Sequence, residues 1–175
     1  DSPVRHPGSR MRTLSPVSLD SDAFAPFGEV IELENARQLS INGGLSTRFH
    51  DLCQIDCSTE GGHVLLNVFR TDPLPLPHEV KIMERHPLGS QAFIPLDRDP
   101  FLVLVAPDGD TVSEEDLVLF QTNGRQGVNF SRNTWHHFQI VTGQQRDFIV
   151  IDRGGPGENL QEVRVIGRAL IDTGE

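Results

Sequence analysis

The sequence contains no cluster of basic residues, and acidic residues outnumber basic ones. Its 15 Lys and Arg stand against 25 Asp and Glu, which gives a formal net charge of −10 with histidine neutral. Nucleic acids and anionic membranes are bound through clustered Lys and Arg, which neutralise phosphate groups. The composition therefore disfavours both kinds of partner.

Long apolar runs are also missing. The longest runs, such as residues 101–106, have the length of a strand, whereas a membrane-spanning helix needs about 20 apolar residues. We expect no membrane segment and no secretory signal.

Cysteine is scarce, because Cys53 and Cys57 are the only two. If both lie on one strand, their Cα atoms are about 13 Å apart, beyond the roughly 7 Å limit for a disulfide. A turn between them would bring them closer, and the sequence leaves that open. We expect free thiols and therefore a cytoplasmic protein, since disulfides persist mainly in oxidising compartments.

A chain of 175 residues fits one domain with a sizeable core. Residues 1–10 show no hydrophobic periodicity and end in Gly-Ser-Arg just before Met11. We interpret residues 1–10 as a disordered leader or a segment added for expression, and residues 11–175 as the single domain.

Short apolar stretches recur about every ten residues, separated by Gly, Pro, Asn and Asp, which is typical of a β-sandwich or β-barrel. We expect strands over residues 29–33, 45–50, 63–70, 101–106, 117–121, 127–130, 138–141, 147–152 and 163–166. One short helix is predicted over residues 20–27, with Asp20 or Ser21 as its N-cap and Gly28 as its end. The expected fold class is all-β, a jelly-roll barrel or sandwich with one or two short helices.

Glu84 and His86 belong to a polar stretch that also contains Gln91. Side chains two apart on a strand share a face at a spacing of roughly 6–7 Å, so an extended chain would present Glu84 and His86 together. Pro87 and Gly89 disfavour a helix and favour a strand that runs into a turn. Gln91 follows this turn and can fold back toward the same pocket.

His136 and His137 lie in a second polar element, residues 131–137, which has the pattern of a turn followed by an apolar strand. Adjacent residues on a strand face opposite ways, so at most one of these imidazoles points inward. Two strand-turn elements that each carry a histidine can form a metal site inside a barrel.

These two elements resemble the motifs of the cupin superfamily. The first cupin motif is His-x-His with an acidic residue five positions later, where this chain has Glu84-x-His86 and Gln91. The second has a Gly and a single His after a turn, where this chain has Asn133 and His136. Several separate blocks resemble the ureidoglycolate lyase family more specifically: residues 41–45, 48–52, 84–96, 122–129, 132–137 and 151–155.

The resemblance runs from about Met11 to the C-terminal region and implies a cupin-like barrel. It further implies a cytoplasmic homodimer that splits (S)-ureidoglycolate into glyoxylate and urea in allantoin and purine breakdown. Members of the family are described with a divalent metal, usually nickel. One departure is Phe138-Gln139, where the family commonly has Pro-Leu.

Ureidoglycolate bears a hydroxyl, a carboxylate and the urea nitrogen on one carbon, so breaking its C–N bond requires proton removal from the hydroxyl and protonation of the nitrogen. A metal chelated by the substrate would lower the hydroxyl pKa. We expect Glu84, His86, Gln91 and His136 to face the metal, a mixed set that suits Ni, Zn, Mn or Fe(II) and does not choose among them. Glu84 or His137 is the candidate proton carrier, because an ordinary imidazole titrates near neutral pH.

The substrate carboxylate calls for an arginine, which binds carboxylates through two parallel hydrogen bonds. Arg70 and Arg48 are the candidates, with Lys81 and His50 as further candidates for substrate binding.

Other interpretations remain open. The same residues fit an amidohydrolase that releases ammonia, a metal-dependent oxygenase, or a non-catalytic carboxylate-binding cupin. Gln91 could be a plain hydrogen-bonding residue, Arg48 and His50 could be dimer contacts, and Asp152-Arg153 could be only an ion pair.

Overall fold

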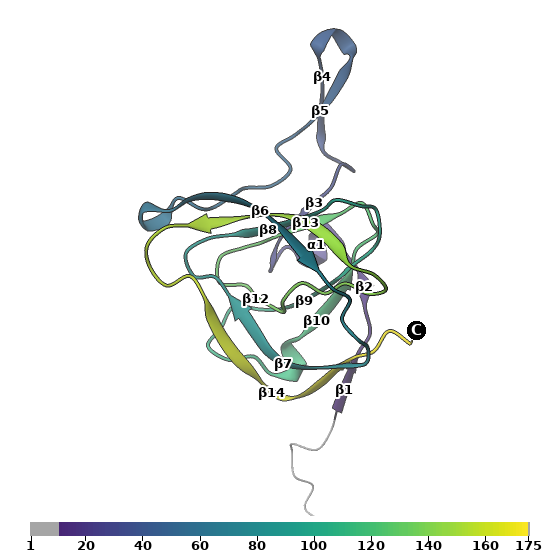
Figure 1. Cartoon of the computed structure of the whole chain (residues 1–175), viewed down its shortest axis with the longest axis vertical. Coiled ribbons are helices and arrows are strands. Elements are labelled where there is room, and N and C mark those ends of the chain that lie inside the picture. The colour runs from purple at the N-terminus through teal and green to yellow at the C-terminus, as the bar shows by residue number, and fades with distance from the viewer. Residues whose placement is uncertain (1–10, 175) are drawn as a thin grey trace, which may run out of the picture.

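Two β-sheets pack against each other in the computed structural model, which describes residues 11–174 (Figure 1). The five-stranded sheet lies across the top of the body in Figure 1, the seven-stranded sheet curls beneath it, and a two-stranded hairpin projects above. The predicted all-β class is confirmed, and the curled sheets are consistent with a cupin-like sandwich. The predicted leader, residues 1–10, lies outside the described range.

The seven-stranded sheet has the order β1-β14-β7-β12-β9-β10-β2. Its strands are β1 (Met11–Leu14), β2 (Val17–Ser18), β7 (His78–Arg85), β9 (Leu102–Ala106), β10 (Val118–Gln121), β12 (Trp135–His136) and β14 (Gln161–Ile171). Its edge strands β1 and β2 pair parallel to β14 and β10, and the other neighbours are antiparallel. The order brings β12 beside β7, although four strands separate them in the chain.

The five-stranded sheet has the order β3-β11-β8-β13-β6 and is antiparallel throughout. Its strands are β3 (Gly28–Ile31), β6 (His63–Thr71), β8 (Gln91–Pro95), β11 (Gly127–Phe130) and β13 (Arg146–Gly154). The projecting hairpin consists of β4 (Arg37–Ile41), the 3-10 turn η1 (Asn42–Gly44) and β5 (Ser46–His50). Two further 3-10 turns are η2 (Thr59–Gly61) and η3 (Glu114–Asp116).

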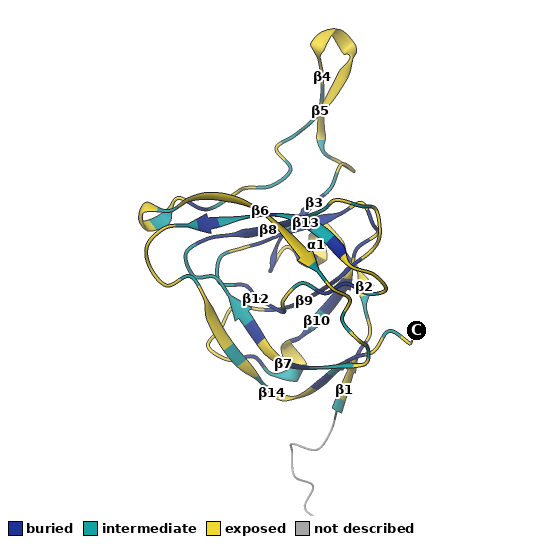
Figure 2. Ribbon diagram, in the orientation of Figure 1, coloured by how far each residue is buried: buried dark blue, intermediate teal, exposed yellow. Residues whose placement is uncertain are grey.

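Apolar side chains fill the space between the sheets, and the strand β9 is buried on both faces. Val103 and Val105 belong to the cluster between the sheets, which includes Phe93 and Phe148. Leu102, Leu104 and Ala106 belong to a second cluster within the curl of the seven-stranded sheet. This burial explains the continuous apolar run at residues 101–106, because neither face of the strand meets water. Figure 2 shows buried residues along both sheets and exposed residues along the hairpin.

The helix α1 (Ser21–Phe24) is shorter than the predicted helix over residues 20–27. Asp20 is its N-cap, as predicted: its Oδ1 accepts the backbone N–H groups of Asp22 at 2.8 Å and Ala23 at 3.0 Å. The chain then turns into β3 at Gly28, which has a φ of 153°. A Cβ there would collide with the backbone carbonyl of Asn129, so the position requires glycine.

The predicted strand over residues 138–141 is wrong, because the strand at this point is β12 and ends at His136. The backbone N–H of His137 still donates to the carbonyl of Leu104 at 3.0 Å. Regular pairing with β9 stops after this hydrogen bond, and Ile140 forms an isolated β-bridge with Leu102. Phe138 is 53% exposed, so its apolar character does not mark a buried strand position.

No helix within residues 11–174 combines the length and apolarity needed to cross a membrane. Cys53 and Cys57 are both free, as predicted. Burial raises the pKa of the Cys53 thiol to about 11, which keeps it protonated at neutral pH.

Candidate metal and substrate site

Glu84 and His136 lie directly opposite each other on the antiparallel strands β7 and β12. His86 follows the end of β7, and the chain turns before Gln91 begins β8. One ligand atom from each of Glu84, His86 and His136 lies within 4.8 Å of the others. The fold therefore brings together residues of the two separate elements whose sequence pattern predicts one shared metal site.

The hydrogen bonds of His86 fix which of its nitrogens carries the proton. Its Nδ1 is 2.8 Å from the carbonyl oxygen of Asn159, which can only accept, so Nδ1 donates. In the neutral ring Nε2 then carries a lone pair, and it lies 3.1 Å from Oε1 of Gln91. The Gln91 amide is held in this orientation because its Nε2 donates to Asp152 at 3.2 Å. Two lone pairs thus face each other, an arrangement that a cation stabilises.

His136 shows the same pattern. Its Nδ1 lies 3.1 Å from the carbonyl oxygen of His137 and therefore donates, which leaves a lone pair on Nε2. That Nε2 is buried and has no hydrogen-bond partner within residues 11–174. The ring stacks on Phe130 with 4.2 Å between centroids and 2° between planes. The imidazole is therefore held rigidly with an unshared lone pair.

Burial sets the charge states of this cluster. Desolvation lowers the pKa of His136 to about 3, with the nearby His86 as a second cause, so the ring is neutral and able to bind a metal at pH 7. Desolvation also raises the pKa of Glu84, whose carboxylate is 4.0 Å from His136 Nδ1. Two imidazole nitrogens, a carboxylate and an amide oxygen fit a divalent transition metal and leave coordination positions for a ligand.

A cavity of about 320 Å³ reaches this cluster and is lined by both Glu84 and Gln91. Arg70 lines the same cavity and is held by a bidentate pair with Asp147, at 2.9 and 3.1 Å. Phe138 forms part of the wall. Neighbouring residues of a strand face opposite ways, and Phe69 packs inward on Phe93, so the Arg70 guanidinium lies with Asp147 on the outer face of the sheet. The cavity thus joins the candidate metal site to the stretch of β6 that carries Arg70.

Comparison with known proteins identifies the relatives of this chain. A family model described as "Ureidoglycolate lyase" matches residues 11–171. The chain belongs to the ureidoglycolate lyase family. The "Ureidoglycolate lyase" of Burkholderia mallei (strain NCTC 10229) is 53% identical over 152 residues, which cover 87% of this chain and 89% of the relative.

Two further ureidoglycolate lyase relatives come from other bacteria. The "Ureidoglycolate lyase" of Pseudomonas syringae pv. tomato is 46% identical over 152 residues, 87% of this chain and 89% of the relative. "Ureidoglycolate lyase 1" of Rhizobium meliloti is 49% identical over 155 residues, 88% of this chain and 89% of the relative. The family membership indicated by the sequence blocks is confirmed.

Within this ureidoglycolate lyase fold, four other candidate residues lie away from the cluster. His137 follows the end of β12, and its Nε2 is 3.3 Å from Nε2 of His78. Lys81 is exposed on β7. Arg48 and His50 lie on β5 in the projecting hairpin (Figure 1). A single chain therefore does not bring these four side chains to Glu84.

Two groups that orient the ligands in this member of the ureidoglycolate lyase family were not predicted from the sequence. The Asn159 carbonyl fixes the proton of His86, and Asp152 fixes the amide of Gln91. Asp152 falls in one of the family-like blocks, residues 151–155, which was the only signal for it. The role of a backbone carbonyl such as that of Asn159 depends on the path of a loop and leaves no signal in residue types.

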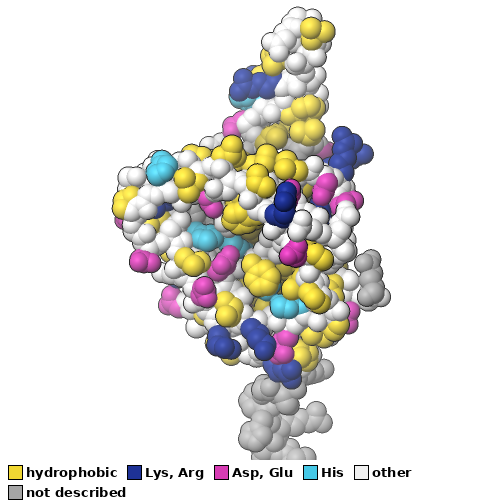
Figure 3. Space-filling view, in the orientation of Figure 1, with side chains coloured by type: hydrophobic (Ala, Val, Ile, Leu, Met, Phe, Trp, Pro, Cys, Tyr) yellow, Lys and Arg dark blue, Asp and Glu magenta, His cyan; other side chains and the backbone are white. Residues whose placement is uncertain are grey.

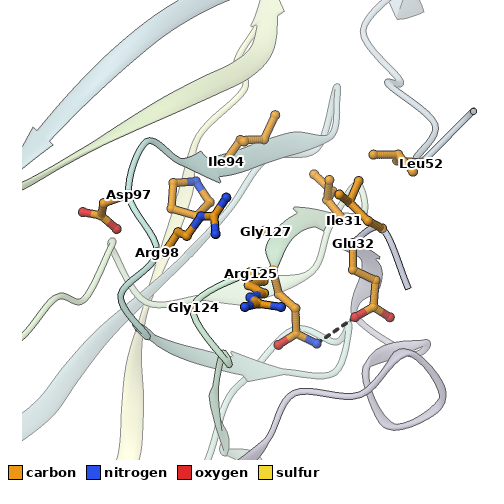
Figure 4. A pocket seen from close by; sticks show the side chains of 12 residues that line it. Ile31, Glu32, Leu52, Ile94, Asp97, Arg98, Gly124, Arg125 and Gly127 are labelled. Carbon is orange, nitrogen blue, oxygen red and sulfur yellow. Dashed lines mark hydrogen bonds between the residues drawn. The ribbon is translucent and has the colours of Figure 1, made fainter. Parts of the chain in front are cut away.

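A larger cavity, about 430 Å³, lies elsewhere, at the root of the hairpin. Figure 4 shows Arg98 across this cavity from Ile31 and Leu52. Gln126 donates to Glu32 at 2.8 Å beside it. No histidine among residues 11–174 lines this cavity, so the described residues offer no set of metal ligands there comparable to the cluster at Glu84.

Protein freed of metal by a chelator is expected to lose stability as the pH falls from about 6.5 to 5. Burial lowers the pKa of His136 to about 3 and that of His137 to about 4, from an ordinary value of 6.5. Below pH 6.5 the unfolded chain binds these protons and the folded chain does not, so the stability present above pH 6.5 is lost on acidification. The loss is about 2 kcal/mol per histidine over this range. Urea unfolding at pH 7 and pH 5 measures it, and equal stabilities at the two pH values would contradict it.

Proposed function

We propose that this chain is a metal-dependent ureidoglycolate lyase, a carbon–nitrogen lyase that splits (S)-ureidoglycolate into glyoxylate and urea. The observation that carries this proposal is the cavity lined by Glu84 and Gln91, two members of the cluster that also contains His86 and His136. Family membership over residues 11–171 supports the same reaction. The proposed metal is Ni²⁺, on the basis of the family resemblance, since the donor set itself also suits Mn²⁺, Zn²⁺ and Fe²⁺.

The proposed metal ligands are His86 Nε2, His136 Nε2, Gln91 Oε1 and the Glu84 carboxylate. When bound, the metal would act as a Lewis acid that lowers the pKa of the substrate hydroxyl. Arg70, one of the residues that line the cavity, is the proposed partner of the substrate carboxylate, which its guanidinium would reach from the outer face of β6.

Glu84 is the proposed proton carrier, because its carboxylate belongs to both the cluster and the cavity. It accepts the hydroxyl proton, the electrons of the O–H bond form the new carbonyl, and the C–N bond breaks. The departing nitrogen takes the proton back from Glu84, which completes urea, and glyoxylate remains. The raised pKa of Glu84 favours this shuttle, since a base works best when its pKa is near the working pH. His137, which faces His78, is not placed for this role in the single chain.

The test is turnover of (S)-ureidoglycolate with glyoxylate, urea and ammonia all quantified, before and after chelation and after re-addition of Ni²⁺ or Mn²⁺. We expect equal amounts of glyoxylate and urea, loss of turnover on chelation and recovery with metal. Ammonia in place of urea would identify an amidohydrolase instead. Saturable binding without turnover under any metal would identify a non-catalytic carboxylate-binding protein.

We also propose that two copies of the chain form a homodimer, as the family resemblance implies. The outer face of the five-stranded sheet carries exposed Val64, Leu66 and Val68 on β6, at 57%, 72% and 60% exposure. Ile151 and Ile149 lie directly opposite the last two of these on β13 and extend the same face. Figure 3 shows apolar side chains gathered across the upper part of the body, below the hairpin.

The hairpin supplies a second reason for a partner. It pairs with no strand of either sheet, and Leu45 at its tip is 90% exposed. A two-stranded hairpin alone is marginally stable in water. A second copy related by a two-fold axis offers a matching apolar face and hairpin, so each copy covers the other. Any contact of Arg48 or His50 with substrate would then require this partner.

The two free thiols are consistent with a cytoplasmic location.

Leu66→Asp is expected to convert the dimer to a monomer, because it places a charge in the apolar face. Light scattering after size exclusion would then give a mass near 19.4 kDa in place of twice that value. Ile166→Asp is the control, since Ile166 is 57% exposed on β14, in the other sheet. A monomeric parent protein, or an unchanged dimer in Leu66→Asp, would contradict this interface.

A further inference from the structure

Three polar side chains form a row across neighbouring strands beside the metal cluster. Gln91 lies on β8, Asp152 on β13 and Asn67 on β6, and these strands are adjacent in the order β8-β13-β6. Asp152 accepts from both neighbours: Oδ2 from the Gln91 amide at 3.2 Å and Oδ1 from the Asn67 amide at 3.1 Å. The far end of the Gln91 amide, Oε1, faces His86 Nε2 at 3.1 Å.

Asp152 has no ion-pair partner within residues 11–174, which corrects the possibility of a simple pair with Arg153. Adjacent residues on β13 face opposite ways. Arg153 therefore points elsewhere, and its guanidinium donates to the carbonyls of Thr59 and Pro156. Among the described residues, the two side chains that donate hydrogen bonds to the half-buried Asp152 carboxylate are the amides of Gln91 and Asn67.

We propose that Asp152 is a positioning residue that makes Gln91 a metal ligand, an inference that rests on the proposed metal site. The two ends of an amide have nearly the same shape, so hydrogen bonding alone decides which end faces the cluster. A carboxylate only accepts, so it holds the NH₂ end of Gln91 toward itself. The oxygen end is thereby turned toward His86 Nε2, where it can bind a cation.

Asn67 has the complementary task of holding Asp152. Its amide occupies Oδ1, which leaves Oδ2 directed at Gln91. Asp152 also brings a negative charge close to the cluster, which favours a divalent cation there. The row therefore sets both the orientation of a neutral ligand and the local charge.

Asp152→Asn tests this role with almost no change in shape. If Asn67 continues to donate to the oxygen of the new amide, the NH₂ group of that amide faces Gln91. Gln91 then turns its own oxygen toward position 152 and presents its NH₂ group to His86 Nε2, which blocks the metal. We expect the affinity for Ni²⁺, measured by calorimetry on chelator-treated protein, to fall about 10- to 100-fold, the usual effect of losing an outer-shell partner.

The double variant Asp152→Asn with Gln91→Glu separates positioning from folding. Glutamate has an oxygen at both ends, so it can accept from the new amide at position 152 and still face the metal. We expect this exchange of acid and amide to restore most of the Ni²⁺ affinity. A purely structural role for Asp152 predicts no such rescue.

His86→Ala distinguishes failure of this inference from failure of the proposed site. Loss of Ni²⁺ binding in His86→Ala, together with parental affinity in Asp152→Asn, would overturn the role of Asp152 and leave the metal site intact. Failure of the double variant to recover affinity would also overturn it. Parental Ni²⁺ affinity in His86→Ala would overturn the metal site and, with it, the role of Asp152.

Discussion

His136→Ala is expected to abolish metal binding and to lower kcat by more than about 100-fold, the upper effect of losing an outer-shell partner of a metal. His136 is the most buried member of the cluster, and its Nε2 has no other partner within residues 11–174. Its stacking on Phe130 fixes the ring, so no neighbouring side chain can take its place. The measurements are bound metal per chain by mass spectrometry and single-turnover release of glyoxylate.

The variant also leaves a small cavity beside Phe130, so folding must be measured together with activity. His86→Ala provides an independent check, since His86 is only partly buried and its removal disturbs packing less. His63→Ala is the matched control, because His63 is exposed on β6 and outside the cavity. Unchanged metal content and turnover in His136→Ala would refute the assignment of this residue.

The closeness of the Glu84, His86 and Gln91 side chains could be predicted from the sequence, because it depends on local geometry. Residues two apart on a strand share a face, and a turn with Pro87 and Gly89 returns the chain toward its start. The pairing of this element with His136 was predicted from the motifs of a known superfamily. Periodicity alone does not show that β12 lies beside β7.

Other features depend on long-range register, which residue types do not encode. The placement of Asp152 next to Gln91 requires β13 to pair with β8 in one register, since a shift by one residue would turn Asp152 to the other face. The hairpin was predicted only in part, because residues 45–50 alternate but Arg37–Ile41 carries a weak apolar pattern. The hairpin projects from the body because its strands pair only with each other within the described residues. A local sequence pattern does not show whether a hairpin packs against the rest of the domain.

Arg70→Ala is expected to lower kcat/KM for (S)-ureidoglycolate by about 10- to 100-fold, the range for losing a charge-assisted hydrogen bond to a carboxylate. The effect should appear mainly as a higher KM, because Arg70 binds a carboxylate that does not change during the reaction. Asp147 fixes the guanidinium through two hydrogen bonds, and these bonds hold the pKa of Asp147 below its ordinary value. Steady-state kinetics with saturating metal measure both parameters.

The structure offers a matched control for the loss of such a pair. Arg168 forms an equivalent bidentate pair with Glu79, at 2.9 and 3.3 Å, and does not line the cavity. Arg168→Ala should therefore leave KM unchanged. Arg70→Lys keeps the charge but loses the planar fork, so its KM should lie between those of the parent and Arg70→Ala. Equal KM values for Arg70→Ala and Arg168→Ala would show that the substrate carboxylate binds elsewhere, and the hairpin of a second copy, with Arg48, would become the next place to look.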